Sequence, residues 1–404
     1  MTGPFADLLV LDLSNILAGP SVGMFFAELG ARVIKVESAL GGGDATRGWK
    51  LPIEDPNDDV PAYFASVNWG KESIALDLRE PSAREVVCDL ARRADILIQS
   101  YKPGDEVKLG LDYDRMCAIN PRLIYAQINA YGPDDPRPGL DAIVQAEAGF
   151  TYMNGQPDGP PTKMPVALID ILLAHQLKEA ILLALLRRER TGEGARLSCS
   201  LLQAAVASLA NQAANWLHAG HVSQRLGSEH PNIVPYGSVL RLADGRELIV
   251  AVGTDAQFAD LADLLGAGEW KEDARFRTNA ARVRHRAILM PELTERVAAA
   301  PIEAFIEGLR AAKIPFGFIN DMRRAFDLPR AREMVLEAKR PGGRRASATR
   351  TIAFSGGDYS PREDLSPPPR FNEHEREILK GLLGYTEEKI ARLREEGALP
   401  PERR

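Results

Sequence analysis

Short apolar runs alternate with amphipathic stretches along the first 200 residues of the chain. The runs are typical of buried strands, and the stretches are typical of helices that cover a sheet. Strands are expected at 8–13, 32–36, 73–77, 96–99 and 123–128, and helices at 21–29, 83–91 and 116–119. This strand–helix–strand order predicts a parallel sheet with right-handed crossovers. We therefore expect an α/β fold with a Rossmann-like large domain over 1–200, completed by about 345–404.

The pattern changes after residue 200. A continuous helical stretch at 201–219 predicts a linker helix within 201–224. Alternating stretches at 237–242 and 247–252 flank a Gly-containing turn and predict a β-hairpin. Helical periodicity at 255–265, 281–299 and 302–312 completes a smaller α+β domain, expected over 225–340. A Gly- and Pro-rich returning linker over 341–369 and a final helix at 372–383 end the expected order.

Length, charge and cysteine content limit the classes of protein to which this chain can belong. A chain of 404 residues, 45% of them hydrophobic, can bury a large core in two domains, and a net charge of -6 without a basic stripe argues against a nucleic-acid surface. Three cysteines without CxxC spacing indicate neither a disulfide framework nor a zinc site. Apolar runs stay below about 18 residues, so we expect a cytoplasmic protein without a membrane span. The turn after the first strand lacks the GxGxxG fingerprint of dinucleotide-binding folds.

One aspartate is a candidate catalytic group. Asp170 lies between a Pro- and Gly-rich turn at 158–162 and a long apolar helix expected at 171–190. Ile169 and Ile171 flank it, so its carboxylate is expected to be partly desolvated, which makes it a better nucleophile or base. An equally weighted alternative is that Asp170 only caps the following helix, because Asp is a favoured N-cap residue.

A dozen short motifs occur in a fixed order along nearly the whole chain. They include Leu29 to Glu37, Gly43-Asp44, Thr46-Arg47, Val67-Asn68 with Lys71, Lys102 to Gly104, Asn120 to Ile124, Asp141-Ala142, Gln145-Ala146 and Thr191 to Gly194. Each motif is too short to be specific, but their order and spacing are specific. In these motifs the chain resembles the class III CoA-transferases, the CaiB/BaiF family, and is similar to its formyl-CoA transferase and succinate–hydroxymethylglutarate CoA-transferase groups.

The resemblance implies roles for individual residues. Asp170 stands at the position of the nucleophile that carries the acyl group and then CoA. Leu76 is expected to line the adenine slot, Ser100 replaces an asparagine that contacts CoA, and Lys108 replaces an arginine that reaches phosphate. Arg47 and Lys71 fall within the same matched segments and are expected to bind CoA as cations.

Other positions depart from the formyl-CoA transferase pattern. Ser38 replaces a CoA-binding arginine, and Leu17 replaces an active-site glutamine. Gly253 and Thr254 occupy the loop that covers the nucleophile in the family, and Gly253 is the one glycine in a stretch that is glycine-rich there. This pattern is closer to members that use dicarboxylates.

The expected reaction is transfer of CoA from an acyl-CoA thioester, such as succinyl-CoA or another dicarboxylyl-CoA, to a free carboxylic acid through a covalent aspartyl intermediate. By resemblance, the protein is an intertwined homodimer and requires no metal or redox cofactor. Two alternatives stay open. An α-methylacyl-CoA racemase shares this fold, but Leu140 stands where that enzyme has a histidine. The other alternative, a non-catalytic acyl-CoA-binding protein, would be indicated by loss of Asp170.

Overall fold

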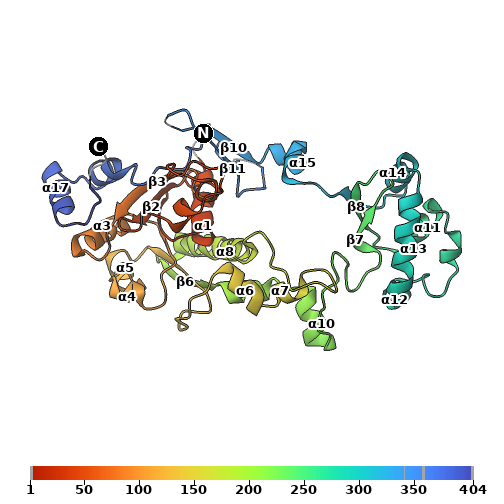
Figure 1. Cartoon of the computed structure of the whole chain (residues 1–404). Coiled ribbons are helices and arrows are strands. Elements are labelled where there is room, and N and C mark those ends of the chain that lie inside the picture. The colour runs from red at the N-terminus through yellow and green to blue at the C-terminus, as the bar shows by residue number, and fades with distance from the viewer. Residues whose placement is uncertain (1–2, 341, 357–359, 402–404) are drawn as a thin grey trace. The chain divides into compact units, whose positions relative to one another are not determined.

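The computed structural model describes residues 3–340, 342–356 and 360–401 (Figure 1). The chain divides into two compact units, which are described separately below. The first unit comprises Met1–Ala148, Pro165–Leu209 and Arg332–Arg404, and the second comprises Gly149–Met164 and Ala210–Ala331.

A six-stranded sheet forms the centre of the first unit. Its strands are β1 (Leu9–Leu13), β2 (Arg32–Ser38), β3 (Lys71–Leu76), β4 (Ile96–Gln99), β5 (Ile124–Asn129) and β6 (Ala195–Ser200). The order is β3-β2-β1-β4-β5-β6, and every neighbouring pair is parallel. The strand order reverses between β1 and β4, which are neighbours in the sheet. The α/β prediction with a parallel sheet is confirmed.

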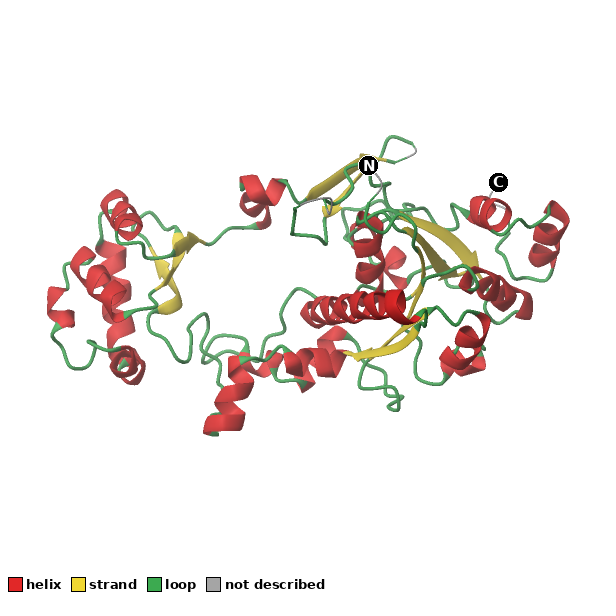
Figure 2. Cartoon of the chain, turned by 180° about the vertical axis from the view of Figure 1, so that it is seen from behind, coloured by secondary structure: helices red, strands yellow, loops and turns green. Residues whose placement is uncertain are grey.

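Helices cover both faces of this sheet (Figure 2). One face packs against α1 (Ala18–Glu28) and α8 (Leu168–Thr191). The other face joins a core with α3 (Pro81–Ala91), α5 (Tyr113–Ile119), the π-helix η3 (Glu377–Leu382) and α17 (Glu387–Glu395). Strand geometry explains this division, because successive side chains of a strand point to opposite faces. Leu9, Leu11 and Leu13 of β1 belong to the core on the α3 face. Val10, which alternates with them along the strand, is also buried.

Short elements connect these layers in the first unit. They are η1 (Ala45–Gly48), α2 (Ala62–Ala65), α4 (Asp105–Lys108), α6 (Asp141–Glu147) and α9 (Leu201–Ala207). Near the end of the chain, β10 (Val335–Lys339) and β11 (Arg345–Thr349) form an antiparallel hairpin. The sequence pattern predicted only an extended returning linker over 341–369, and β11 lies within it.

The second unit is a small α+β assembly. Its antiparallel sheet has the order β7 (Tyr236–Arg241), β8 (Glu247–Ala251) and β9 (Phe316–Phe318). The helices of this unit are α7 (Phe150–Met153), α10 (Asn211–Ala219), α11 (Asp255–Leu264), η2 (Gly268–Lys271), α12 (Asn279–Arg284), α13 (Arg286–Ala299), α14 (Ile302–Ala311), α15 (Met322–Asp327) and α16 (Pro329–Arg332), the last of which runs into the first unit. The predicted hairpin is confirmed as β7–β8, and Trp270 stacks on Phe258 in the core beside it.

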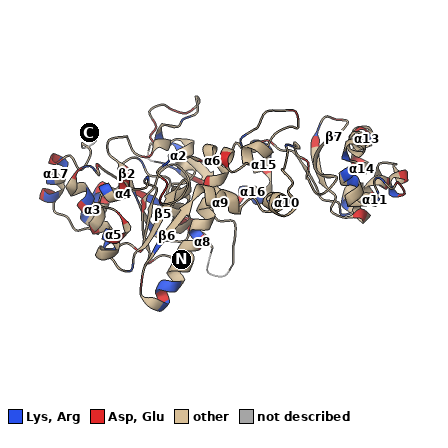
Figure 3. Ribbon diagram, turned by 90° about the horizontal axis from the view of Figure 1, so that it is seen from below, with Lys and Arg blue, Asp and Glu red and all other residues tan. Residues whose placement is uncertain are grey.

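Three expected helices differ from the structure. The single linker helix predicted over 201–224 is wrong, because Ala210 has a φ of 47° and divides the stretch into α9 and α10. The stretch predicted at 281–299 is divided at His285 into α12 and α13. The final helix predicted at 372–383 is limited to η3, and α17 follows it. Acidic and basic side chains are interspersed along α17 (Figure 3). Within the residues that the structure describes, no helix is long and apolar enough to cross a membrane.

Candidate active site

Asp170 lies towards the carboxyl edge of the parallel sheet. It is the third residue of α8, a helix of 24 residues. The far end of α8 is at the amino edge, because Gly194, just after the helix, donates its N–H to Pro121 O (2.8 Å) immediately before β5. A helix of this length that packs along the strands must begin towards the opposite edge. Ligands of open α/β sheets bind outside the carboxyl ends of the strands.

The carboxylate of Asp170 is buried without a compensating partner. The residue is 8% exposed, and its neighbours Ile169 and Leu173 are fully buried. Among the described residues, no cation forms an ion pair with Asp170, and no hydrogen bond to its carboxylate lowers its pKa. Burial, followed by the negative charge of Asp141, raises the pKa of Asp170 from 3.8 to about 7. The group is therefore poised to change its charge near neutral pH.

Asp141, not Asp170, caps helix α8. Its Oδ1 accepts the N–H of Ile169 (2.7 Å) and, more weakly, that of Asp170 (3.4 Å). Its Oδ2 accepts a hydrogen bond from Nε2 of the buried Gln145 (2.6 Å), one helical turn further along α6. Since the residue at the start of α8, Ala167, provides no side-chain cap, the interpretation of Asp170 as a capping residue is wrong. Asp141 satisfies the free N–H groups of the helix and leaves the Asp170 side chain available.

A second group of buried charges lies below the turn that follows β1. Lys71 Nζ pairs with Asp12 Oδ2 (2.7 Å), and Lys35 Nζ pairs with Asp44 Oδ2 (2.9 Å). All four side chains are fully buried. Burial alone would raise the pKa of Asp12, but the charges of Lys71 and Lys35 outweigh it and hold that pKa at about 2. These carboxylates are therefore ionised and structural.

These charges shape the turn after β1, at the point where the strand order reverses. Lys35 Nζ donates to Ser14 O (2.8 Å), and the Asp44 carboxylate accepts the N–H of Ile16 (3.2 Å). Ile16 has a φ of 75°, a conformation that β-branched residues rarely adopt. Asn15, the residue before Ile16, donates its N–H to Ser100 Oγ (3.1 Å), and Ser100 directly follows β4. The turn is thus held rigidly beside the crevice where this fold class binds ligands.

An aromatic pair lies at the start of the chain segment that leads into α2. Trp49 and Tyr63 meet edge to face, with ring centroids 5.1 Å apart. Burial raises the pKa of Tyr63, and the nearby charges of Asp170, Asp141 and Asp44 raise it further. The charge of the candidate nucleophile therefore acts on the phenol of Tyr63.

Three of the predicted CoA-binding residues are interior residues in this structure. Arg47 pairs with Glu37 through two hydrogen bonds (2.7 and 2.6 Å) and stacks on Phe64. Lys71 donates to Asp12, Pro20 O and Asn68 Oδ1, which uses its three N–H bonds. Leu76 is fully buried in the core on the α3 face of the sheet. The contacts described for these three side chains are with the protein itself.

The other predicted residues are more accessible. Ser100 is half-buried at the reversal point, and Lys108 is exposed on α4, with Asp105 as its partner (2.7 Å). Gly253 and Thr254 belong to the second unit, where Thr254 caps α11 by accepting the N–H of Gln257 (3.1 Å). Their role as a lid remains a prediction. Among the described residues, no group of three or more His, Cys, Asp and Glu side chains is placed to hold a metal ion.

Sequence reasoning did not assign roles to Asp141, Gln145 or Tyr63. The two-residue matches at Asp141-Ala142 and Gln145-Ala146 contained a usable signal, because Asp and Gln four residues apart lie on one face of a helix. Their contact with α8 spans 28 residues of sequence and becomes visible only in the fold.

Comparison with known proteins places the chain among CoA-transferases. The family model described as CoA-transferase family III matches residues 5–375. The chain is 36% identical to a succinate–glutarate CoA-transferase of Agrobacterium fabrum, covering 94% of this chain and 96% of that protein. It is 35% identical to the succinyl-CoA:glutarate CoA-transferase of Mus musculus, covering 96% and 89%. A CaiB/BaiF family protein from Brucella suis superposes with a TM-score of 0.81 at 39% identity, covering 95% of this chain and 100% of that one.

Proposed function

The chain belongs to CoA-transferase family III, as its motifs predict, and we propose that it moves CoA from an acyl-CoA thioester to a free carboxylic acid with Asp170 as the nucleophile. The observation that carries this proposal is the environment of Asp170. A buried carboxylate with a pKa of about 7 and no cation partner among the described residues is costly to the fold, whereas it suits covalent catalysis.

The transfer proceeds through two anhydrides and one aspartyl thioester. A carboxylate oxygen of Asp170 attacks the thioester carbonyl, forming a mixed anhydride and releasing CoA thiolate. The thiolate attacks the aspartyl carbonyl, the donor acid leaves as its carboxylate, and Asp170 carries CoA as a thioester. The acceptor carboxylate attacks this thioester and releases the thiolate again. Attack of the thiolate on the acceptor carbonyl of the new anhydride yields the new acyl-CoA and restores the Asp170 carboxylate.

We place CoA at the crevice between the ends of β1 and β4. Ser100 and the adjacent Asn15 lie there, and the exposed ammonium group of Lys108 can reach a phosphate. Arg47, Lys71 and Leu76 support the walls of this site from inside, since their contacts are already made within the protein. Gly253 and Thr254 are proposed to cover the bound thioester as a gating loop.

We further propose dicarboxylates as donor and acceptor, succinyl-CoA being the first donor to test. The relatives from Agrobacterium fabrum and Mus musculus carry succinate and glutarate in their names. A homodimer is supported by the exposed apolar side chains of α8, Leu182, Leu183 and Leu186, which a partner would cover. Three cysteines free of disulfides suit a reducing compartment such as the cytoplasm.

The test combines transfer with isotope exchange. The protein is incubated with succinyl-CoA and a panel of carboxylic acids that includes glutarate, and new CoA esters are identified by mass. In parallel, a 2-methylacyl-CoA is incubated in deuterated water without an acceptor. We expect CoA transfer and no deuterium at the α-carbon, because Leu140 cannot exchange a proton on the second face of the substrate. Rapid α-deuteration without transfer would establish the racemase instead.

A further inference from the structure

A compact acidic loop links the two aromatic residues Trp49 and Tyr63. The acidic loop, defined here as residues 49–61, contains Glu54, Asp55, Asp58 and Asp59. Glu54 closes it by accepting the N–H of Leu51 (2.7 Å) and that of Ala62 (2.6 Å). Trp49 at its start thereby meets Tyr63 just after its end.

The acidic loop has little apolar anchorage of its own. The buried cluster beneath it consists of Val60, Phe64 and Ala65. Leu51 and Ile53 are exposed, Ile53 to 90%. Burial of so little apolar area cannot offset the conformational entropy of ordering a loop of this length. Contacts from elsewhere in the chain are needed to hold the loop in place.

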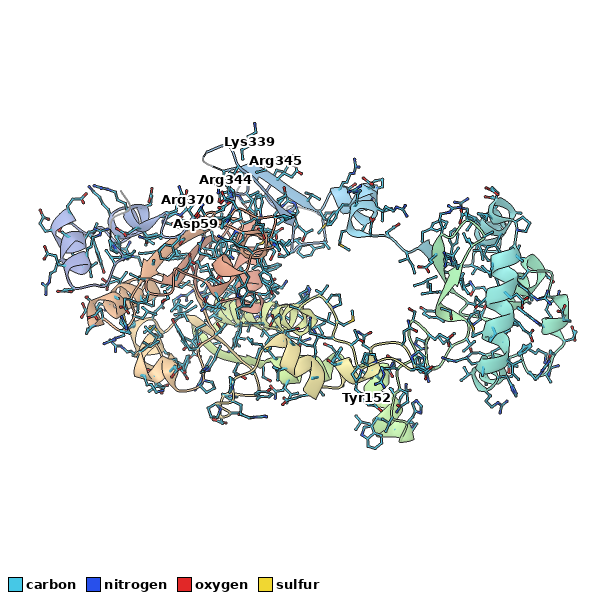
Figure 4. All side chains as sticks on the ribbon, in the orientation of Figure 1. Asp59, Tyr152, Lys339, Arg344, Arg345 and Arg370 are labelled. Atoms are coloured by element: carbon cyan, nitrogen blue, oxygen red, sulfur yellow. The ribbon has the colours of Figure 1, made fainter. Side chains whose placement is uncertain are left out.

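Asp59 is held by Arg47, Arg370 and Phe371. The contacts to Asp55 and Asp58 come from the β10–β11 hairpin. Arg340 pairs with Asp58 through two hydrogen bonds, one of 2.9 Å and one shorter, and the Arg340 side chain is 7% exposed. Arg344 reaches Asp55 (2.5 Å) and Asp58 (3.2 Å). Figure 4 labels Lys339, Arg344 and Arg345 of the hairpin and also Arg370, which approaches Asp59 to 3.6 Å. The body of β11 also packs against α2, the helix that carries Tyr63.

The charge pattern of the hairpin fits this role. Lys339 lies directly opposite Arg345, and Arg340 donates its N–H to Arg344 O across the turn. Like charges at facing positions destabilise a hairpin unless anions compensate them. For Arg340 and Arg344, which face each other across the turn, Asp58 and Asp55 supply that compensation from a segment more than 280 residues distant in sequence. The hairpin and the acidic loop therefore stabilise each other.

We propose that the β10–β11 hairpin is a clamp that holds the acidic loop, and with it Trp49 and Tyr63, in the position that catalysis needs, with Arg340 and Asp58 as the central positioning residues. The catalytic consequence rests on the proposed function of Asp170. The effect of the clamp on the order of the acidic loop is independent of that function. Misplacement of groups around a reacting centre by about 1 Å can cost about a hundredfold in rate, so a clamp of this kind acts on kcat more than on KM.

The test compares two arginines of one hairpin in the full-length protein. Arg340→Met removes the clamp, whereas Arg345→Met removes an exposed arginine that pairs with Glu337 of the neighbouring strand. Amide hydrogen exchange of the peptide covering 49–62 is measured together with kcat and KM for CoA transfer. We expect Arg340→Met to speed exchange in this peptide about tenfold and to lower kcat about tenfold with KM little changed, and Arg345→Met to do neither.

Two further variants protect this test against misfolding. Asp58→Asn weakens the same contact without altering the hairpin, and the double exchange Arg340→Asp with Asp58→Arg is expected to restore protection of 49–62 and part of kcat. Unchanged exchange in both Arg340→Met and Asp58→Asn would overturn the clamp, even in an active enzyme. Faster exchange with unchanged kcat would show a purely structural contact and would overturn the catalytic part. Absence of transfer in the wild type would contradict the proposed function and leave the exchange result to decide the clamp.

Discussion

Two groups of buried carboxylates in the first unit differ in one respect. Asp12, Asp44 and Glu37 each face a buried cation, namely Lys71, Lys35 and Arg47. Asp170 and Asp141 face each other, and among the described residues neither forms an ion pair with a Lys or Arg. The pKa of Asp12 is held at about 2, and that of Asp170 is raised to about 7.

The paired carboxylates stabilise the fold, whereas the unpaired carboxylate of Asp170 is available for chemistry. Buried ions are tolerated when they are paired and hydrogen-bonded, and the paired group uses both features to hold the turn at Ile16. An unpaired buried carboxylate lowers stability at neutral pH and is kept where its reactivity is used.

The largest effect is expected at Asp170. Asp170→Asn removes the nucleophile and should lower kcat by about a thousandfold or more, because positioning alone cannot replace a covalent step. Asp158→Asn changes an exposed aspartate in the preceding turn and should retain activity. Turnover of Asp170→Asn near that of Asp158→Asn would remove Asp170 from the mechanism.

Breaking the paired group should cost stability. Lys35→Met leaves Asp44 buried without its cation and is expected to destabilise the fold by about 3–5 kcal/mol, measured by urea unfolding. Lys380→Met removes an exposed lysine paired with Glu387 and should leave the unfolding midpoint nearly unchanged. Equal midpoints for the two variants would show that burial of the charges does not matter here.

Removing the unpaired charge of Asp170 should raise the free energy of unfolding instead of lowering it. Between pH 4 and 7 native Asp170 retains a proton that the unfolded chain has released, so wild-type stability falls as the pH rises through this range. Asp170→Asn lacks this loss and is expected to be more stable than wild type by on the order of 2–4 kcal/mol at pH 8, and little different at pH 4. Urea unfolding at both values measures this. A variant that is less stable at pH 8 would contradict the raised pKa.

The smallest effect concerns the charge of Asp141. Asp141→Asn keeps an oxygen acceptor for the start of α8 and removes the charge next to Asp170. Because that charge raises the pKa of Asp170, the acidic limb of kcat/KM against pH should move to lower pH by up to about one unit. An unchanged limb in Asp141→Asn, or an equal shift in Asp158→Asn, would show that another group controls the profile.

Sequence reasoning predicted the parallel sheet, which the structure confirms, and selected Asp170 as the candidate nucleophile, because both have local signals. Apolar runs marked β1, β2 and β4, and the motifs around Asp170 were contiguous. It predicted Arg47 and Lys71 as CoA-binding cations but not their ion pairs within the protein, because a motif records which residue is present and not which way it faces. Their burial against Glu37 and Asp12 depends on strands brought together by the fold. The pairs Asp141–Ile169 and Arg340–Asp58 span 28 and 282 residues, and no local pattern indicates them.

The most direct test of the account is to trap the intermediate. The protein is mixed with succinyl-CoA without acceptor, treated with hydroxylamine or borohydride, digested with trypsin and analysed by mass spectrometry. An aspartyl-CoA thioester is an electrophile at a single carboxyl group. The account predicts a mass change confined to Asp170 that is absent from Asp170→Asn. Modification of Asp141 or Asp158 instead, or an unmodified peptide from protein that is turning over, would contradict it.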